Sequence, residues 1–231
     1  MLIAFRWMLR LFTGLVVLGL VAGWLAYYIL SRSLPNYTQD ISLPGITAPV
    51  EIVRNNANVP HIFGGNEPDV FFGLGFVHAQ DRLWQMTMLR RTAQGKLSEI
   101  FGSRTEKIDE LLRRLDIYEL SLSSVAAQGP RTQAVLEAYA AGVNAWIAQV
   151  NSGARGRGAP EFFLFSNEIA AWAPADSIAI IKLMALDLSA HLETEVQRAQ
   201  LSQILKADRL ADILPDDPGA PIAALPDYSA L

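Results

Sequence analysis

Apolar and polar residues alternate along this chain with periods that predict mainly helices and one β-hairpin. The longest helical pattern covers residues 66–94, between a candidate N-cap, Asn66, and Gly95. Its apolar positions recur at three-, four- and seven-residue steps, which is typical of a helix that buries one broad face. These positions are Val70, Leu74, Val77, Trp84 and Met88.

Two glycines, Gly73 and Gly75, interrupt this long helix. Because glycine weakens a helix, we expect a neighbouring strand or helix to approach the backbone there. Asp81 and Arg82 are adjacent and therefore diverge, so each needs a partner of its own. We expect a buried polar network at this point that fixes how the helix packs.

Shorter patterns predict the remaining elements. Residues 50–54 and 59–63 read as the two strands of a hairpin, with turn residues between them and Pro60 at an edge or bulge. Amphipathic helices are predicted at residues 106–115 and 130–150. An apolar helix buried almost all round is expected at residues 177–189, and a polar helix at residues 193–206.

The start of the chain predicts a membrane anchor. Residues 11–30 carry no charge, and as a helix they would span the roughly 30 Å hydrocarbon core of a bilayer. Arg6 and Arg10 precede them, which favours a cytoplasmic N-terminus and a periplasmic location for everything after Ser31. The alternative is a cleaved signal peptide, which a mature N-terminus near Ser31 would reveal.

These features divide the chain into four segments. Residues 1–32 form a cytoplasmic stub and transmembrane anchor, and residues 33–49 form a tether interrupted by prolines. Residues 50–213 form the folded domain. Residues 214–231, with many prolines and alanines, form a spacer or tail.

Composition limits the chemistry that the chain can carry. Half of its 231 residues are hydrophobic, and the net charge of −4 comes from interspersed acids and bases, so no nucleic-acid surface is expected. The absence of cysteine excludes disulfides, thiolate metal sites and a cysteine nucleophile.

The histidines offer a candidate metal site or catalytic base at His61 and His78. Neither has a second ligand at helical spacing, and His191 lies far away in sequence. We therefore favour a histidine hydrogen-bonded inside the packed helix near Asp81, with a histidine metalloenzyme as an alternative that a metal assay would test.

Several motifs follow one another in a fixed order. They are Val59-Pro60-His61-Ile62, Gly73-Leu74-Gly75-Phe76-Val77-His78-Ala79-Gln80-Asp81-Arg82-Leu83-Trp84-Gln85-Met86, Tyr139-Ala140-Ala141-Gly142-Val143-Asn144-Ala145-Trp146 and Trp172-Ala173-Pro174-Ala175-Asp176. With these motifs the chain resembles the penicillin acylase family of N-terminal-nucleophile hydrolases, and specifically the first, or alpha, part of the precursor. The resemblance covers residues 34–205.

The resemblance implies an α+β fold. The chain would be the alpha-chain part of a four-layer αββα hydrolase, mainly helical with one β-hairpin, and would have a large exposed apolar surface where the beta part docks. It also implies hydrolysis of a small linear amide, such as a β-lactam side chain or an N-acyl homoserine lactone. The nucleophile would be a serine at the start of the beta part, acting with its own α-amine as base. No catalytic residue is therefore assigned to this chain, which alone should be inactive; Ser229 is followed by Ala230 and not by the asparagine that the family implies.

The resemblance further implies substrate and metal contacts. Met184 and Leu188 match acyl-pocket positions, and their spacing places both on one helix face; plain core packing is the alternative. Glu195 matches a ligand of a structural calcium ion, or Glu193 if the preceding loop shifts, and two solvated acids at a helix start are the alternative.

The sequence thus predicts the alpha portion of an acylase in the cytoplasmic (inner) membrane. Its partners would be the beta part of the same precursor, a small amide and the membrane through residues 11–30. The competing hypothesis is a non-catalytic, membrane-anchored helical module that binds a partner. A downstream Ser-Asn start followed by a long second part would favour the enzyme.

Overall fold

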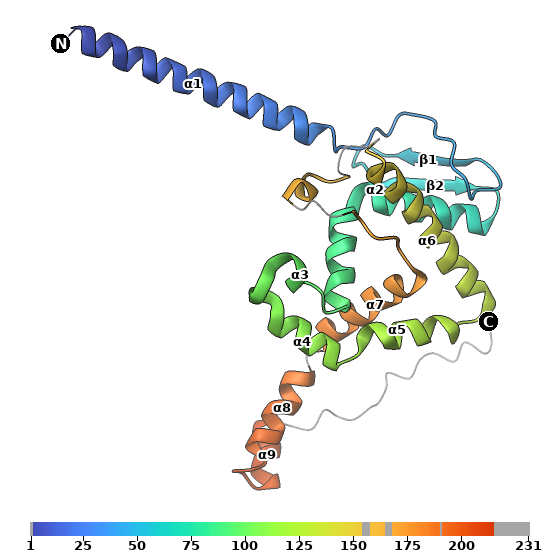
Figure 1. Cartoon of the computed structure of the whole chain (residues 1–231). Helices are drawn as coiled ribbons and strands as arrows, with labels where there is room; N and C mark the ends of the chain where they lie inside the picture. Colours follow the sequence, from blue (N-terminus) through green and yellow to red (C-terminus); the bar gives the residue numbers. More distant parts are fainter. Residues whose placement is uncertain (1, 154–157, 165–167, 190, 215–231) are drawn as a thin grey trace. The chain divides into compact units, whose positions relative to one another are not determined.

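The computed structural model describes residues 2–153, 158–164, 168–189 and 191–214 (Figure 1). The chain divides into two compact units, Met1–Lys182 and Leu183–Leu231, and each is described by itself. The expected spacer or tail lies, from residue 215 onward, outside the described residues.

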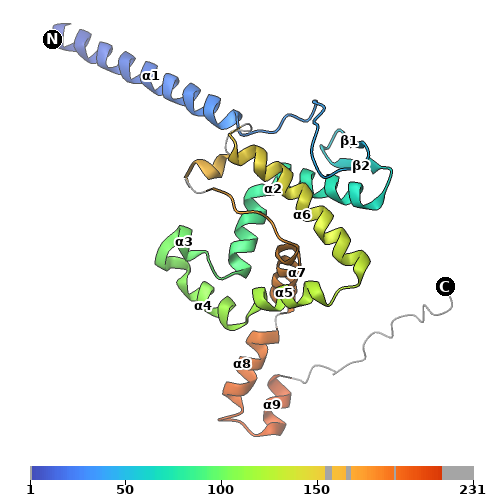
Figure 2. The ribbon, with the colours of Figure 1, turned by 45° about the vertical axis from the view of Figure 1, so that its right-hand side comes forward.

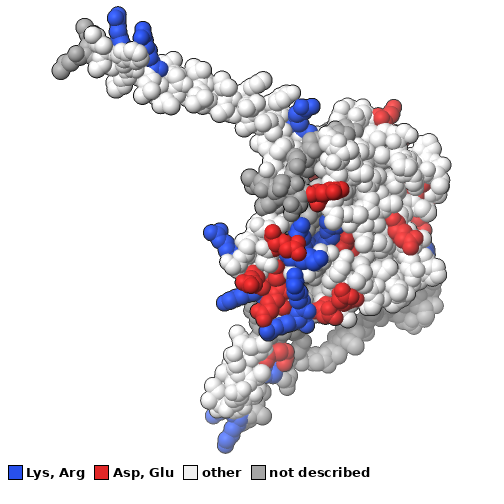
Figure 3. All heavy atoms as spheres, viewed as in Figure 1, with Lys and Arg blue, Asp and Glu red and all other residues white. Residues whose placement is uncertain are grey.

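The first helix, α1 (Leu2–Ser31), has charges only near its start, at Arg6 and Arg10. Figure 3 shows the long uncharged surface that follows them. The stretch Ile3–Ser31 has a mean hydropathy of 1.9, so it is long and apolar enough to cross a membrane, a property that signal sequences share. Near its end the rings of Trp24 and Tyr28 stack with their centroids 5.7 Å apart.

The predicted hairpin is present as β1 (Val50–Arg54) and β2 (Pro60–Gly64), paired antiparallel. Pro60 is the first residue of its strand, where its missing N–H is tolerated. A Cβ atom added to Gly73 would lie 2.9 Å from Val50 and 3.0 Å from Ile62, one on each strand. The expectation that a strand crosses the long helix at this glycine is confirmed.

The long helix is α2 (Glu67–Ala93), and it begins at the expected N-cap, where the Asn66 side chain accepts a hydrogen bond from the Asp69 N–H at 2.9 Å. The helix kinks at Arg82, whose φ of −136° is not helical. Its buried face is rotated from the predicted one, because of the five predicted positions only Val77 is fully buried. The apolar residues buried on α2 are Phe72, Phe76, Val77, Ala79, Leu83, Met86 and Ala93.

The core forms where α2 meets α6 (Pro130–Asn151), as Figures 1 and 2 show. A Cβ atom on Gly75 would collide with the Tyr139 carbonyl, and one on Gly142 would collide with the Phe72 carbonyl. The two backbones therefore touch at a pair of glycines, and Phe76 packs edge-to-face on Trp146 beside them, with ring centroids 5.5 Å apart. This explains the rotated face of α2, since the face that meets α6 is centred on Gly75, with Phe76 beside it.

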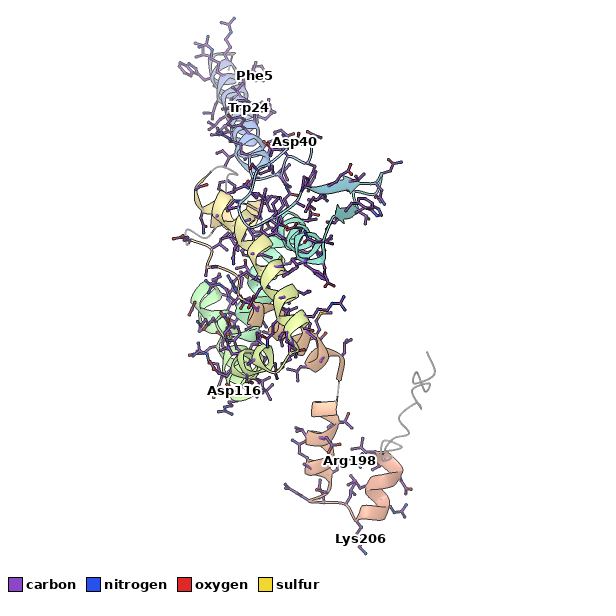
Figure 4. The ribbon with its side chains drawn as sticks, turned by 90° about the vertical axis from the view of Figure 1, so that its right-hand side faces the viewer. Phe5, Trp24, Asp40, Asp116, Arg198 and Lys206 are labelled. Atoms are coloured by element: carbon purple, nitrogen blue, oxygen red, sulfur yellow. The ribbon has the colours of Figure 1, made fainter. Side chains whose placement is uncertain are left out.

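Short helices follow α2: α3 (Ser98–Phe101), a 3-10 turn (Gly102–Thr105), α4 (Glu106–Arg114) and α5 (Ile117–Ala126). The predicted helix at residues 106–115 is confirmed as α4. Asp116, labelled in Figure 4, links it to α5 in a left-handed conformation with φ of 56°. No local pattern predicts α5, because serines interrupt its apolar positions; one of them, Ser121, is buried and donates to the Ile117 carbonyl at 2.7 Å.

The last helices are α7 (Pro174–Ser189), α8 (His191–Leu201) and α9 (Ala207–Ile213), after a 3-10 turn at Pro160–Leu164. The expectation that α7 is buried almost all round is wrong for its second half, where apolar side chains are exposed. The predicted polar helix corresponds to α8, which ends five residues earlier than expected, and α9 was not predicted.

The segment expected as a tether is fastened to the domain at two points. Tyr37 donates to Asp81 at 3.0 Å, and Arg54 binds both oxygens of the same carboxylate at 2.8 and 2.9 Å. Further along, Thr47 donates from its N–H and its hydroxyl to Asp69 at 2.9 and 2.8 Å. We call residues 36–48 the strap.

Asp81 belongs to a polar network, as the sequence predicts, but this network is not fully buried. The side chain of Asp81 is 21% exposed and that of Arg54 is 10% exposed. Arg82 does not join the network and instead donates to Gln85 at 3.3 Å on the exposed side of α2. The network therefore joins the strap, the hairpin and the helix near the molecular surface.

Candidate functional site

The start of α7 is held by a buried aspartate, Asp176. Its carboxylate accepts from the Ala173 N–H at 2.7 Å and from the Tyr118 hydroxyl at 2.9 Å, and the guanidinium of Arg90 lies 3.5 Å away. Burial, together with the nearby charge of Asp176, raises the pKa of Tyr118 above its usual value. The motif that contains Trp172 and Asp176 thus begins a helix whose first turn is fixed to α2 and α5.

The same arginine also fixes the chain before α7. Arg90 donates to the Ala170 and Ala171 carbonyls at 3.1 and 2.9 Å, and its guanidinium lies 5.4 Å from the centroid of the Trp172 ring. Sequence reasoning did not single out Arg90 or Tyr118. Helical spacing could have indicated that Arg90 is buried, because it continues the spacing of the buried positions Leu83 and Met86 and so falls on the interior face of α2.

The two predicted acyl-pocket residues lie on α7 beyond this fixed start. Met184 is 56% exposed and Leu188 is 79% exposed. Ile181, three residues before Met184, is also exposed, so the helix carries a stripe of uncovered apolar side chains. Neither side chain is buried by the described residues, so both are open to contact with a further group.

The predicted calcium ligand, Glu195, lies on α8 and is exposed. It forms an ion pair with Arg198, labelled in Figure 4, at 3.6 Å. The side chain of Glu193 lies outside the described ones. Among the described residues no group of three or more histidine, cysteine, aspartate or glutamate side chains comes together. Because calcium takes about six to eight oxygen ligands, the described side chains around Glu195 could supply only part of a calcium site.

The two described histidine side chains lie on different elements. His78 lies on α2, where its Nδ1 is 3.0 Å from the Tyr139 hydroxyl. The hydrogen bond that was expected is thus made to α6, but the expectation that the histidine lies inside the packed helix is wrong, because His78 is exposed. Partial desolvation of the ring against α6 lowers the pKa of His78, and burial raises the pKa of Tyr139 to about 12. His61 lies on the exposed face of β2.

Two cavities open on the first unit. One, of about 540 Å³, lies between the strap, β1 and the middle of α2. The other, of about 340 Å³, lies beside Arg90 and Asp176, next to the start of α7. The first is the larger, and a free strand edge runs along it.

Comparisons with known proteins match this arrangement. A family model described as penicillin amidase matches residues 49–225. The chain is 34% identical over 200 residues to penicillin acylase 2 proenzyme of Pseudomonas sp. (strain SE83), covering 85% of this chain and 25% of that protein. It is 34% identical over 192 residues to acyl-homoserine lactone acylase QuiP of Pseudomonas putida, covering 79% and 22%.

A solved structure is similar as well. The thermostable penicillin G acylase from Alcaligenes faecalis matches with a TM-score of 0.61 and 26% identity, covering 76% of this chain and 96% of the matched chain. The chain thus spans nearly all of one solved polypeptide, but only 22–25% of the length of the two curated relatives.

Proposed function

The chain belongs to the penicillin amidase family, and we propose that it is the alpha portion of an acylase that hydrolyses linear amides. This proposal rests on how much of each relative the chain covers. It covers 96% of a solved penicillin G acylase chain but only 25% of a penicillin acylase proenzyme. The remainder, the beta part, would bring the N-terminal serine and the oxyanion donors. With it the fold becomes the four-layer αββα arrangement, in which this chain supplies helices and one hairpin.

The substrate class follows from the relatives and from α7. One relative is named a penicillin acylase and another an acyl-homoserine lactone acylase, so the proposed substrate is an apolar acyl group on a small amine. Met184 and Leu188 present an uncovered apolar stripe that such an acyl chain can contact once the beta part closes the other side.

The test is to produce the chain with and without the beta part and to assay hydrolysis of penicillin G and of N-acyl homoserine lactones. We expect activity only from the combined protein, which would also separate the enzyme from a non-catalytic binding module. Met184→Ala and Leu188→Ala should each lower kcat/KM for a long acyl chain by about tenfold, since each removes roughly 1–2 kcal/mol of apolar contact. Ile204→Ala, at an exposed position outside α7, is the matched control and should change nothing.

Calcium enters the proposal only for the combined protein. Glu195 would supply one ligand after releasing Arg198, and the beta part would supply the rest. We expect calcium to raise the melting temperature of the combined protein but not that of the chain alone, and Glu195→Gln to weaken this effect.

A further inference from the structure

The smaller cavity, of about 340 Å³, lies beside the second half of α2. Its other walls are α3, Tyr118 on α5 and residues 168–171, and all of its lining residues belong to the first unit. Figures 1 and 2 show the second half of α2 passing between α3 and α7. Its volume falls within the range of roughly 300–1,000 Å³ that is usual for small-molecule sites.

The least accessible charged group of the cavity wall that lacks a full set of partners is the guanidinium of Arg90, a residue that is 5% exposed. Its Nη1 donates to the Ala170 and Ala171 carbonyls, and the carboxylate of Asp176 lies 3.5 Å away, beyond a good hydrogen bond. The N–H groups on Nε and Nη2 form no hydrogen bond with any residue that the structure describes, yet neither nitrogen is fully enclosed. These N–H groups therefore face the cavity.

The free N–H groups of Arg90 indicate which acceptor fits. Nε and Nη2 lie side by side in the guanidinium plane, so their N–H groups form a fork that matches the two oxygens of a carboxylate. Because a buried donor without an acceptor is costly, a carboxylate at this point would stabilise the folded chain.

The charges around the cavity limit the charge of the ligand. The cations and anions of the lining cancel; they are Arg90, Arg91 and Lys96 on one side and Glu99, Glu168 and Asp176 on the other. Arg91 pairs with Glu99 at 2.7 Å, and the ammonium of Lys96 has no ion-pair partner within the described part of the chain. A lining without net charge favours a singly charged ligand over a dianion such as phosphate.

Much of the remaining wall is apolar. The rings of Trp84 and Phe162 meet edge-to-face with their centroids 5.1 Å apart. Trp84, Met88 and Ile100 line the cavity and are half-buried. This location explains why Trp84 and Met88, both predicted on the buried face of α2, are not fully covered. A wall of this kind suits a hydrocarbon chain or a ring.

We propose that this cavity binds a small monocarboxylate with an apolar tail. The carboxylate accepts from Nε and Nη2 of Arg90, and the tail packs against Trp84, Met88 and Ile100. The inference does not rest on the proposed function, because such binding needs neither amide hydrolysis nor the beta part. It can therefore be tested on the full chain by itself.

NMR of the arginine Nε–H signals tests the contact without any substitution. The full chain, kept in detergent micelles because of α1, is titrated with 3-phenylpropionate. We expect a saturable shift of the Arg90 signal, while the signal of Arg54, which is bound to Asp81, stays in place as the internal control. A signal of Arg90 that does not shift, or shifts without saturating, would overturn the inference.

Three further probes test the class of ligand. 3-Phenylpropanamide has the same tail but no charge, and it should bind at least about tenfold more weakly than 3-phenylpropionate. Acetate and inorganic phosphate lack the tail, and each should also bind at least about tenfold more weakly. If the amide binds equally well, the charge is not used; if acetate or phosphate does, the apolar wall is not used. Either result means that the proposed class of ligand is wrong.

Substitutions test the location. Arg90→Lys keeps a cation beside Asp176 but removes the fork, and it should weaken binding of 3-phenylpropionate at least about tenfold. Ile100→Trp fills the cavity and leaves Arg90 in place, so it decides the question if Arg90→Lys does not fold. It should weaken binding to a similar extent. Ile108→Trp, at an exposed position on α4 outside the cavity, is the matched control and should change binding less than about twofold.

Circular dichroism shows whether each variant is folded before its binding is measured. Binding that is as tight in folded Ile100→Trp as in the wild-type chain would place 3-phenylpropionate elsewhere and overturn the inference. Equal losses in Ile100→Trp and Ile108→Trp would do the same, because the second substitution lies outside the cavity.

Discussion

At the scale of single residues, the fold depends on close backbone contacts and on buried carboxylates such as Asp69. Gly75 and Gly142 let α2 and α6 touch, and no larger side chain can occupy either position without moving a carbonyl group. Asp69, which is 2% exposed, collects donors from the strap and from the N-cap Asn66. Each of these residues acts between elements that lie apart in the sequence.

The glycine contact gives a first prediction. Gly142→Ala should destabilise the domain by about 3 kcal/mol, the upper end of the usual cost of overpacking, because its Cβ would meet backbone and not the end of a flexible side chain. Chemical denaturation followed by circular dichroism measures the change. Gly65→Ala is the control, since nothing lies within 4 Å of a Cβ there, and it should shift stability by less than about 0.5 kcal/mol. A mild effect of Gly142→Ala would mean that the two helices separate easily.

Asp69 gives a prediction on pH dependence. Hydrogen bonds from Thr47, led by its backbone N–H, lower the pKa of Asp69 to about 2. Because the folded pKa lies below the unfolded value near 3.9, this carboxylate stabilises the fold above about pH 4 and loses that effect as the pH falls toward 2. Asp69→Asn should therefore be less stable than wild type at pH 6, and the gap should narrow between about pH 4 and 2. Urea unfolding across this range measures it, and a gap independent of pH would contradict the assignment.

At the scale of elements, the parts that were predicted are those encoded by local periodicity. The hairpin, α2, α4 and α6 follow from patterns within a few turns of chain, and their ends agree to within a residue or two. The strap was expected only as a tether, because its fastening residues lie far apart in sequence: 44 positions separate Tyr37 from Asp81. No local pattern indicates such a pairing.

The candidate site, like the helices and the hairpin, could be predicted only where local sequence spacing encodes it. The placement of Met184 and Leu188 on one helix follows from their spacing, and the structure has both on α7. Whether they line a pocket depends on groups outside the described chain, as does the coordination of Glu195. Arg90 and Tyr118, which fix the start of α7, come from α2 and α5, and their meeting at Asp176 depends on tertiary packing that the sequence pattern does not contain.

A substitution at Asp81 tests how firmly the polar network holds the strap. Asp81→Asn should cost about 1–3 kcal/mol, because the partly buried Arg54 would lose its charged partner and an amide nitrogen would replace one of the two oxygens that accept from Arg54 and Tyr37. Limited proteolysis should also cut the strap faster in this variant. Arg114→Gln, which removes an exposed ion pair with Glu110, is the control and should cost less than about 0.5 kcal/mol. If the two variants behave alike, the network does not hold the strap.

At the scale of the whole molecule, the folded part of the chain begins with the strap. The proposed anchor ends at Ser31, and the first fastening point, Tyr37, follows after five residues, which extend to no more than about 20 Å. A domain anchored in this way would be held close to the membrane and not on a long stalk. The anchor and the strap can be separated by truncation, because one lies before Ser31 and the other after it.

Two truncated chains test this boundary. A chain that starts at Ser31 lacks the apolar helix but keeps the whole strap. It should therefore leave the membrane fraction, and its free energy of unfolding should lie within about 0.5 kcal/mol of that of the full chain. A chain that starts at Pro49 also lacks Tyr37, Thr47 and Ala48, which leaves Arg54 without its stacked ring and the buried Asp69 without two donors from Thr47 and one from Ala48. It should unfold at a clearly lower temperature or fail to fold. Mass spectrometry of the full-length product decides between anchor and signal sequence: an N-terminus at Met1 supports the anchor, and one near Ser31 contradicts it. Equal stability of the two truncated chains would show that the strap is only a tether.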